Sequence, residues 1–383
     1  MVKRVFCFVT AVLFVVMTQV SFAAEDRFSA AKGAVLIEAS SGRVLLEKDK
    51  DEKLPNASTT KIMTAIITLE QPNLDEMFTV DAEAIKVEGS SMGLIEGDKV
   101  TLRTLAWGML LASGNDAANA AAAKICGSQQ AFCERMNQKA AELGMRNTHF
   151  SSPSGLENGE HYTTAYDLAL LARYAMKNEV FAEMVSSKSA KLYFGDPPYH
   201  RWLTNHNRLL WQCEDCIGIK TGFTKAAGRC LVSAAQRDGL TLIAVTLGCP
   251  DDFNTHHAIY NECFEMLEFV DFDDMTRQLS VAVTGAEQPR VAVRPMWQPG
   301  AYLTEKERQN VELSITMQPF LYAPVSEGSV VGSAEIRLDD TMLSKTPLIA
   351  AQNVPSRYIE TRSIIERVKD FFQTPEHYRF PLD

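Results

Sequence analysis

Apolar residues along this chain follow two periodicities in succession. Residues 34–39 and 44–47 are short apolar runs joined by a Ser-Ser-Gly-Arg turn, which predicts a β-hairpin. Helical spacing of apolar positions then covers residues 58–69, 102–111, 116–124, 128–143 and a segment opening at Tyr162. Strand patterns follow at 217–224, 230–235 and 240–247, and a last helical pattern covers 254–270. This order predicts an α+β domain whose sheet is built from both ends of the segment.

The pattern changes near Asp273. Helical periodicity stops for about 80 residues, and short alternating runs separated by Gly or Pro turns appear at 279–283, 291–293, 311–315, 330–338 and 348–350. We therefore expect an α+β domain over residues 24–272 and a small all-β domain over 273–355. The last segment, 356–383, predicts an amphipathic helix with one apolar stripe formed by Ile364, Ile365, Val368, Phe371 and Phe372.

The first 23 residues are typical of a secretory signal peptide. Lys3 and Arg4 precede an apolar run over residues 5–16, and Ser21-Phe22-Ala23 is a small-x-small cleavage site. An uncleaved membrane anchor is the alternative, but the apolar run is short for a membrane span. We expect export and cleavage after Ala23.

Composition narrows the class of function. The chain has 383 residues, 46% hydrophobic and 22% charged, which suits a globular protein of two domains or more. Its formal net charge is −10, so nucleic-acid binding is not expected. An anionic group on a substrate must therefore be met by cations placed locally.

Cysteine usage gives a weaker signal. Seven cysteines follow the signal peptide, an odd number that cannot all pair within one chain. Cys213 and Cys216 have C-x-x-C spacing, but no second C-x-x-C completes a zinc site and His206 alone is not enough. Structural or free thiols are favoured over a local disulfide, and no metal is expected.

Ser58 and Lys61 lie three residues apart at a predicted helix start, so their side chains share one face. A serine hydroxyl needs a base to become a nucleophile, and an ordinary lysine is protonated at neutral pH. Burial and a second cation lower the pKa of a lysine, and Lys220 is a candidate for that cation. The helix start also offers the backbone N–H of Ser58 to an oxyanion. The alternative is a helix-capping serine beside a solvated lysine.

Two further motifs follow in order. Ser113-Gly114-Asn115 interrupts a helical stretch, where its hydroxyl could pass a proton and its amide could hold a substrate peptide group. Lys220-Thr221-Gly222 lies in a predicted strand, where one polar side chain can face a cleft and glycine permits close backbone approach. Either motif alone could be an ordinary loop or an ordinary edge strand.

The ordered triple S-x-x-K, S-x-N and K-T-G resembles the motif set of the penicillin-interacting serine acyl enzymes. Residues 57–65, 111–118, 162–168 and 218–224, and the N-x-N-x-L-L segment that begins at Asn205, are similar to the D-alanyl-D-alanine carboxypeptidases of peptidase family S11. The similarity is dense over residues 30–270. It implies a fold like that of penicillin-binding proteins and β-lactamases, with the β-domain and amphipathic tail that the family carries.

The resemblance also implies roles for individual residues. Ser58 would be acylated by the penultimate D-Ala of a peptidoglycan stem peptide, Lys61 would take its proton, and Ser113 would relay a proton. Asn115 would bind the substrate amide, and Lys220 and Thr221 the terminal carboxylate. The backbone N–H groups of Ser58 and Phe223, beside Gly222, would form the oxyanion hole. No cofactor or metal is implied, and β-lactam antibiotics are expected inhibitors.

Two residues depart from the family pattern, and two other functions are alternatives. Phe223 and His206 stand where some relatives have His and Arg, which leaves the role of His206 open. A class A-like β-lactamase would carry a deacylating glutamate loop that residues 156–160 do not match. A catalytically silent wall-peptide binder is the other alternative. The signal peptide indicates a location outside the cytoplasm, and the apolar stripe indicates that the tail binds the outer face of the cytoplasmic membrane. The alternative is that the same stripe packs on the β-domain.

Overall fold

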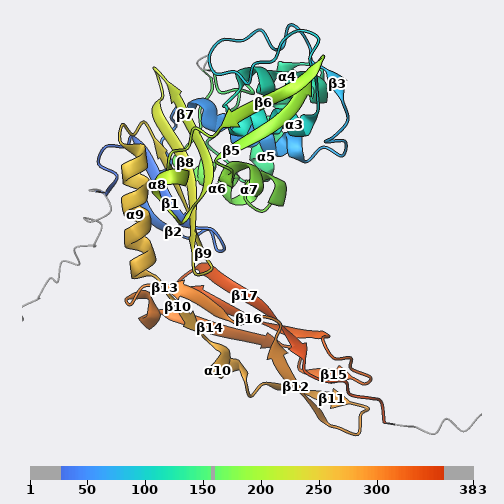
Figure 1. Cartoon of the computed structure of the whole chain (residues 1–383). Coiled ribbons are helices and arrows are strands. Elements are labelled where there is room, and N and C mark those ends of the chain that lie inside the picture. The colour runs from blue at the N-terminus through green and yellow to red at the C-terminus, as the bar shows by residue number, and fades with distance from the viewer. Residues whose placement is uncertain (1–26, 157–159, 358–383) are drawn as a thin grey trace, which may run out of the picture. The chain divides into compact units, whose positions relative to one another are not determined.

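The structure of the protein is a computed structural model that describes residues 27–156 and 160–357 (Figure 1). The predicted signal peptide and nearly all of the predicted amphipathic tail lie outside the described residues. The chain divides after Glu268 into two compact units. The boundary lies a few residues before the change of pattern at Asp273.

The first unit alternates helices with strands of one main sheet. Its strands are β1 (Gly33–Glu38), β2 (Val44–Lys48), β3 (Phe78–Thr79), β4 (Lys99–Val100), β5 (Ser189–Gly195), β6 (Pro198–Thr204), β7 (Cys216–Thr224), β8 (Gly228–Arg237) and β9 (Leu240–Leu247). Its helices are the 3₁₀ helix η1 (Ala57–Thr60), α2 (Lys61–Leu69), α3 (Leu102–Leu110), α4 (Asn115–Cys126), α5 (Gln129–Glu142), α6 (Ala165–Ala175), α7 (Glu179–Ser186), α8 (Leu209–Gln212) and α9 (Asp252–Met266).

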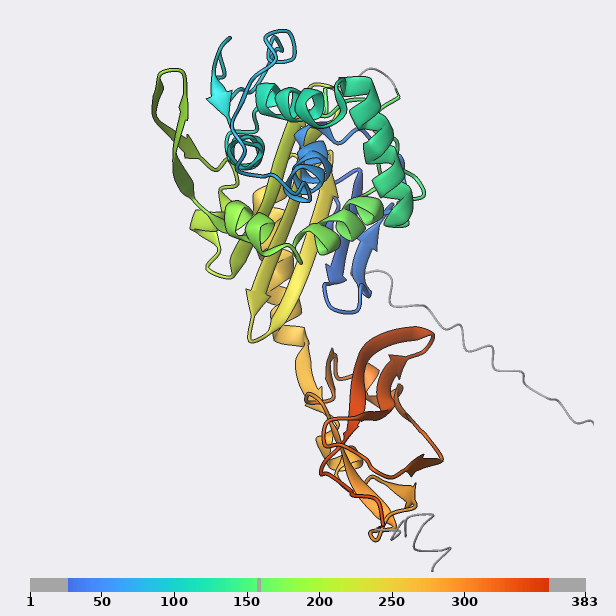
Figure 2. The same cartoon turned by 90° about the vertical axis from the view of Figure 1, so that its right-hand side faces the viewer.

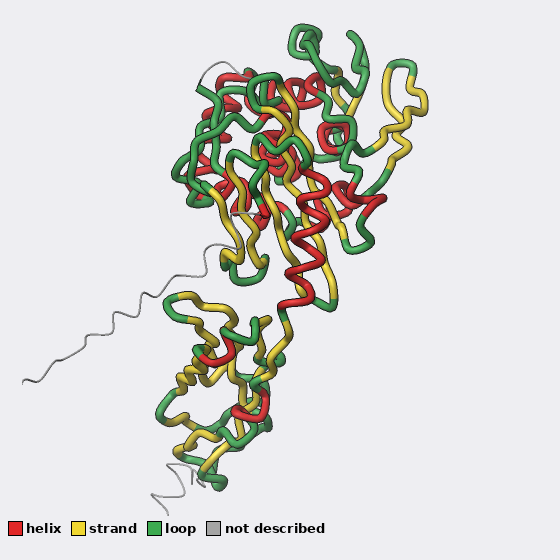
Figure 3. The backbone as a smooth tube through the Cα atoms, turned by 90° about the vertical axis from the view of Figure 1, so that its left-hand side faces the viewer, coloured by secondary structure: helices red, strands yellow, loops and turns green. Residues whose placement is uncertain are grey.

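The main sheet has five antiparallel strands in the order β2-β1-β9-β8-β7. The N-terminal hairpin pairs with the last strand of the unit, β9, so the sheet is built from both ends of the segment as predicted. Helix α9 contacts β8 and β9 on one face, and α6 contacts β1 and β9 on the other. Figures 1 and 3 show α9 along one face, and Figure 2 shows the remaining larger helices gathered on the opposite face.

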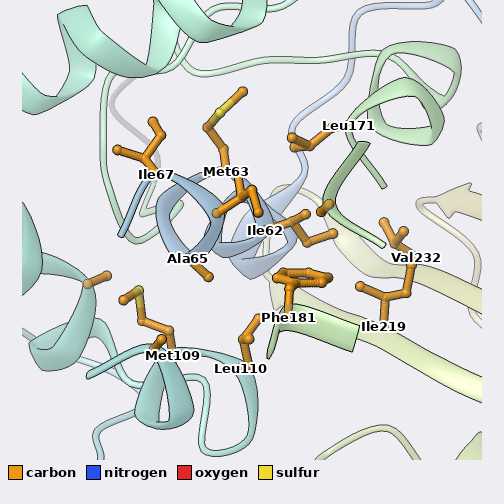
Figure 4. Close-up of a cluster of buried hydrophobic side chains, with 14 of the residues drawn as sticks. Ile62, Met63, Ala65, Ile67, Met109, Leu110, Leu171, Phe181, Ile219 and Val232 are labelled. Atoms are coloured by element: carbon orange, nitrogen blue, oxygen red, sulfur yellow. The ribbon is translucent and has the colours of Figure 1, made fainter. Parts of the chain in front are cut away.

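Helix α2 is the centre of the core. All nine of its residues are buried, the six apolar ones together with the polar Lys61, Thr64 and Thr68. Figure 4 shows Ile62 of α2 beside Phe181 of α7, with Ile219 and Val232 of the sheet further along in the same core cluster. Burying one such side chain stabilises the fold by about 1.5–3 kcal/mol. The helix that follows Ser58 is therefore held from all sides, which fixes the position of the candidate nucleophile.

One local prediction is wrong, and one hairpin was not predicted. The helix expected over 254–270 ends at Met266, because β10 (Glu268–Asp271) begins there and pairs with β13 (Gly300–Leu303) of the second unit. Val270 is therefore a strand residue and not part of the inward face of a helix. The β5–β6 hairpin was not predicted, since its polar and aromatic residues, such as Tyr193 and Trp202, give no clear apolar alternation.

The second unit is built almost entirely of strands, which confirms the expected C-terminal β-domain. Besides β10 and β13 it contains α10 (Asp273–Thr276), β11 (Ser280–Thr284), β12 (Arg290–Pro295), η2 (Glu307–Gln309), β14 (Val311–Met317), β15 (Phe320–Tyr322), β16 (Val330–Leu338) and β17 (Thr341–Ala350). Six strands form a sheet in the order β14-β16-β17-β12-β11-β15. Val291 of β12 and Leu348 of β17 are among its fully buried core residues.

Candidate active site

Ser58 lies in η1, the short 3₁₀ helix that leads directly into α2. The buried Asn56 amide donates to the hydroxyls of Thr59 (3.1 Å) and Thr60 (2.9 Å) and so ties the turn together. Ala57 just before Ser58 has a φ of +47°, a conformation that is costly for a residue with a side chain. Ser58 itself is only half-buried, between buried neighbours. The backbone conformation therefore leaves the Ser58 hydroxyl accessible while the residues around it are buried.

Lys61 is fully buried behind Ser58. Its Nζ lies 2.9 Å from Ser58 Oγ, 2.7 Å from Asn115 Oδ1 and 2.6 Å from the carbonyl oxygen of Ser154. The last two partners can only accept hydrogen bonds. A neutral amine has two hydrogens and one lone pair, so the two carbonyl oxygens use both hydrogens. In this neutral form, the lone pair of Lys61 Nζ is left to accept the proton of the Ser58 hydroxyl.

The surroundings of Lys61 favour this neutral form. Burial lowers the pKa of Lys61 well below its ordinary value, and the nearby charge of Lys220 lowers it further. Asp116 opposes the shift to a smaller extent. The predicted environment of a lysine acting as a base, burial plus a second cation, is therefore present, with burial the larger cause.

Ser113 and Asn115 lie at the turn between α3 and α4. Ser113 is buried with a φ of +56°, another strained position beside the site. The Asn115 amide accepts from Lys61 and donates to the carbonyl oxygen of Glu88 at 2.7 Å. Both the oxygen and the NH₂ group of the Asn115 side chain therefore have hydrogen-bond partners within the protein. The contact between Asn115 and Lys61 was not predicted from the sequence.

Asp116 is a second feature that the sequence analysis missed. Its buried carboxylate accepts hydrogen bonds from the Ser91 hydroxyl (2.5 Å) and from the backbone N–H groups of Met92 (2.9 Å) and Leu94 (3.0 Å). These bonds hold the loop that carries Ser90 against the start of α4. An acidic residue in the first turn of an alanine-rich helix was the available signal.

Lys220 of β7 comes from the other side of the site. Its Nζ donates to Ser113 Oγ at 3.1 Å and to the carbonyl oxygen of Thr221 at 2.8 Å. Burial lowers the pKa of Lys220 to about 7. The chain of contacts therefore runs from Ser113 to Lys220, while Ser58, Lys61 and Asn115 form a separate chain beside it.

Gly222 packs against the turn that carries Ser58. A Cβ at this position would lie 3.0 Å from the carbonyl oxygen of Asn56 and 3.1 Å from the backbone nitrogens of Ser58 and Thr59. Glycine thus allows β7 to lie directly against the Ser58 N–H. Phe223 follows with its ring 67% exposed, so its side chain is not part of the packed core.

These groups border a cavity of about 340 Å³. It is lined by Ser58, Ser90, Ser113, His206, Arg208, Thr221, Gly222, Phe223, Arg229, Asp252 and Phe253. Five of the eight predicted site residues line it, while Lys61, Asn115 and Lys220 are buried behind its wall. A larger hollow of about 550 Å³ in the second unit is lined mainly by residues 318–325 and has no base beside a nucleophile. The chemistry therefore points to the smaller cavity.

Metal-binding groups and cysteine thiols are two other possible sources of catalytic chemistry. Within residues 27–156 and 160–357, no group of three or more His, Cys, Asp or Glu side chains is placed to hold a metal ion. Within the described residues, none of the seven cysteines from Cys126 to Cys263 forms a disulfide. Burial raises the pKa of the Cys216 thiol to about 12, so it is a poor nucleophile.

An α+β domain with a serine, two buried lysines and an asparagine around one cavity defines a serine acyl-transfer enzyme of the penicillin-recognising class. A family model described as D-alanyl-D-alanine carboxypeptidase matches residues 20–251. A second model, described as penicillin-binding protein 5, C-terminal domain, matches residues 298–356. The chain belongs to the D-alanyl-D-alanine carboxypeptidase family of serine hydrolases, as the motifs predicted.

Individual relatives agree with this assignment. The chain is 31% identical to the D-alanyl-D-alanine carboxypeptidase DacF of Bacillus subtilis over 85% of this chain and 86% of the relative. It is 32% identical to DacC of Escherichia coli over 94% and 93% of the two chains. The crystal structure of DacD from Francisella tularensis matches with a TM-score of 0.62 at 29% identity, covering 85% of this chain and 94% of that one.

Proposed function

We propose that this protein removes the terminal D-Ala from peptidoglycan stem peptides that end in D-Ala-D-Ala, through an acyl-enzyme on Ser58. The observation that carries the proposal is the placement of the buried Lys61 Nζ, 2.9 Å from Ser58 Oγ and within hydrogen-bond distance of two carbonyl oxygens, which leaves the neutral amine free to take the Ser58 proton. Family membership supports the same reaction class.

Acylation follows from this geometry. Ser58 Oγ attacks the carbonyl carbon of the penultimate D-Ala as Lys61 Nζ takes the hydroxyl proton. The negative charge on the carbonyl oxygen is stabilised by the backbone N–H groups of Ser58 and Phe223. When the tetrahedral intermediate collapses, the C–N bond breaks. The leaving amine takes a proton from Ser113 Oγ, which regains one as Lys61 gives up the proton it took from Ser58, so Lys61 is neutral again before deacylation. Lys220 holds the Ser113 hydroxyl in place for this transfer.

Deacylation repeats the chemistry with water. Lys61 accepts a proton from a water molecule that attacks the ester carbonyl, and Ser58 regains its proton as the ester bond breaks. The peptide leaves one residue shorter. Each half-reaction returns Lys61 to its neutral form, because the proton from Ser58 goes to the leaving amine and the proton from water goes to Ser58. A β-lactam enters the same path, but its ring-opened acyl group stays attached to Ser58 and blocks the site.

The direct test is incubation of the mature protein with a synthetic stem pentapeptide ending in D-Ala-D-Ala, followed by mass spectrometry. We expect a tetrapeptide and free D-Ala, and neither product with Ser58→Ala. Release of D-Ala by Ser58→Ala at the wild-type rate would refute the proposal.

Fluorescent penicillin separates the rival functions. A carboxypeptidase forms a long-lived adduct, a class A-like β-lactamase turns the drug over, and a silent wall-peptide binder does neither. We expect one stable adduct per chain.

We further propose that residues 1–23 direct export and that residues 356–383 hold the enzyme on the outer face of the cytoplasmic membrane, after a catalytic domain over 24–272 and a β-domain over 273–355. The apolar stripe from Ile364 to Phe372 supports this anchor. Within the described residues, no helix has the length and apolar character needed to cross a bilayer. The test is flotation of the mature protein with liposomes, compared with a chain that ends at Pro355. Equal flotation of the two chains, or of neither, would show that the tail is not the anchor.

A further inference from the structure

The cavity needs a cation for the substrate's free C-terminal carboxylate, and Lys220 is poorly placed to supply it alone. Its side chain is only 1% exposed and does not line the cavity. Its Nζ already donates to Ser113 Oγ and to the carbonyl oxygen of Thr221. Burial lowers the pKa of Lys220 to about 7, so its positive charge is held less firmly than that of an arginine. A permanent positive charge in the cavity must come from another residue.

His206 lines the cavity but does not provide that charge. Burial lowers the pKa of His206 below its ordinary value of 6.5, and Lys220 lowers it further. The imidazole is therefore mostly neutral at pH 7. It can donate one hydrogen bond to a carboxylate, but it does not neutralise the charge.

Arg208 and Arg229 are the two arginines of the cavity, and only Arg229 is hydrogen-bonded to a carboxylate. Arg229 donates to Asp252 Oδ1 from Nε (3.0 Å) and from Nη2 (2.6 Å), so its charge is paired with a buried carboxylate. The exposed Arg208 side chain makes no hydrogen bond or ion pair with any residue of 27–156 or 160–357. It lies over an aromatic ring, and its charge acts on the Asp252 carboxylate only at longer range.

The position of Arg208 is nevertheless fixed. Two buried asparagines hold its segment: Asn205 Oδ1 accepts from Asn207 N at 2.9 Å, and Asn207 Oδ1 accepts from Leu209 N at 3.2 Å. This alternation directs His206 and Arg208 to the exposed side. The Arg208 guanidinium lies over Phe253, 4.9 Å from the ring centroid. Phe253 is itself only 6% exposed, so the ring is a firm support that leaves the N–H groups of Arg208 free.

We propose that Arg208 binds the C-terminal carboxylate of the substrate, with the paired Arg229–Asp252 and the Phe253 ring as its support, and thereby selects peptides with a free carboxylate. This inference rests on the proposed function. Thr221 lines the same cavity and can donate its hydroxyl to the same carboxylate. The guanidinium fork suits a carboxylate because two parallel N–H groups can bond its two oxygens.

The test compares ligands with and without the carboxylate. For Arg208→Gln we expect kcat/KM on an N-acylated L-Lys-D-Ala-D-Ala peptide to fall about 10- to 100-fold, the effect of one lost charge-assisted hydrogen bond. Acylation by benzylpenicillin should slow by a similar factor, because it also carries a carboxylate. Acylation by benzylpenicillin methyl ester should change less than about twofold. Arg208→Lys should retain part of the discrimination, since it keeps the charge without the fork.

Lys225→Gln is the matched control, because Lys225 is an exposed cation in the β7–β8 turn that does not line the cavity. It should leave all three rates unchanged. Equal losses for the acid and the ester in Arg208→Gln, or no loss for the acid, would overturn the assignment. If the wild type fails to cleave the peptide, the proposed function fails, while the penicillin and ester comparison still tests Arg208 on its own.

Discussion

Two regions of the first unit each place a serine beside a base, but only one of these serines is accessible to a substrate. On the cavity side, Ser58 Oγ lies 2.9 Å from Lys61 Nζ. On the α9 side of the sheet, Ser233 Oγ lies 2.6 Å from His256 Nδ1 and 2.6 Å from the hydroxyl of Tyr260. Judged by nucleophile and base alone, the second pair is the more familiar one.

Access and backbone geometry separate the two pairs. Ser233 and His256 are fully buried, and His256 Nε2 lies 2.9 Å from the hydroxyl of Thr246, so each polar group already has a partner inside the protein. Ser58 is half-exposed, lines a cavity, and follows a residue with a positive φ. A reactive serine thus needs an open face and a nearby site for the oxyanion. The Ser233 cluster instead stabilises the packing of α9 on the sheet.

The largest effect is expected on the catalytic side. Lys61→Arg should slow acylation by fluorescent penicillin by about 10⁴-fold or more, because arginine stays protonated and cannot accept the Ser58 proton. The thermal unfolding midpoint should be measured alongside to show that the variant is folded. Since arginine is longer, Lys61→Met provides a second inactive variant. Acylation by a folded variant at a rate near that of the wild type would contradict the assignment of the base.

A smaller change should come from the strand beside Ser58. In Gly222→Ala the new methyl group must push β7 away from the Ser58 N–H by a few tenths of an ångström, since the contacts would be only 3.0–3.1 Å. We expect acylation to slow by about 10- to 100-fold. Lys225→Ala in the adjoining turn serves as the control. Unchanged acylation in Gly222→Ala would show that this close approach is not needed.

A substitution in the buried Ser233–His256 pair should have the opposite effect, lowering stability while leaving acylation unchanged. Ser233→Ala leaves His256 and Tyr260 without a shared partner, so unfolding in urea should become easier by about 1–3 kcal/mol. Penicillin acylation at a temperature well below the unfolding midpoint should stay within about twofold of the wild type. A large loss of acylation in folded Ser233→Ala would break the distinction between the two regions.

The smallest effect concerns pH. Burial lowers the pKa of His256 to about 3, below its ordinary value of 6.5. As pH falls below 6.5 the unfolded chain takes up a proton that the native protein does not, so stability falls with pH. Between pH 6.5 and 5.5 this histidine accounts for a loss of about 1 kcal/mol. His161, whose pKa burial lowers to about 4, acts in the same direction. Urea unfolding of His256→Gln should therefore show a weaker decline over this interval, and an identical decline would contradict this account.

Periodicity and motif order predicted the sheet, the central helices and the β-domain, because apolar spacing directly reflects which faces are buried. The network around the motifs was not predictable in the same way. Asp116 and Ser154 act through a carboxylate and a backbone carbonyl that meet the site only after folding. The role proposed for Arg208 depends on Arg229 being paired with Asp252, and no local sequence pattern reveals that pairing. The strand at β10 was read as helix because Val270 continues the spacing of α9 by chance.

The central claim is that Ser58 is the residue that forms the acyl-enzyme. The most direct measurement is peptide mapping of the penicillin adduct by mass spectrometry after proteolysis. The account predicts a single label on the peptide that contains Ser58 and none on peptides that contain Ser113 or Ser233. A label on any serine other than Ser58 would contradict it.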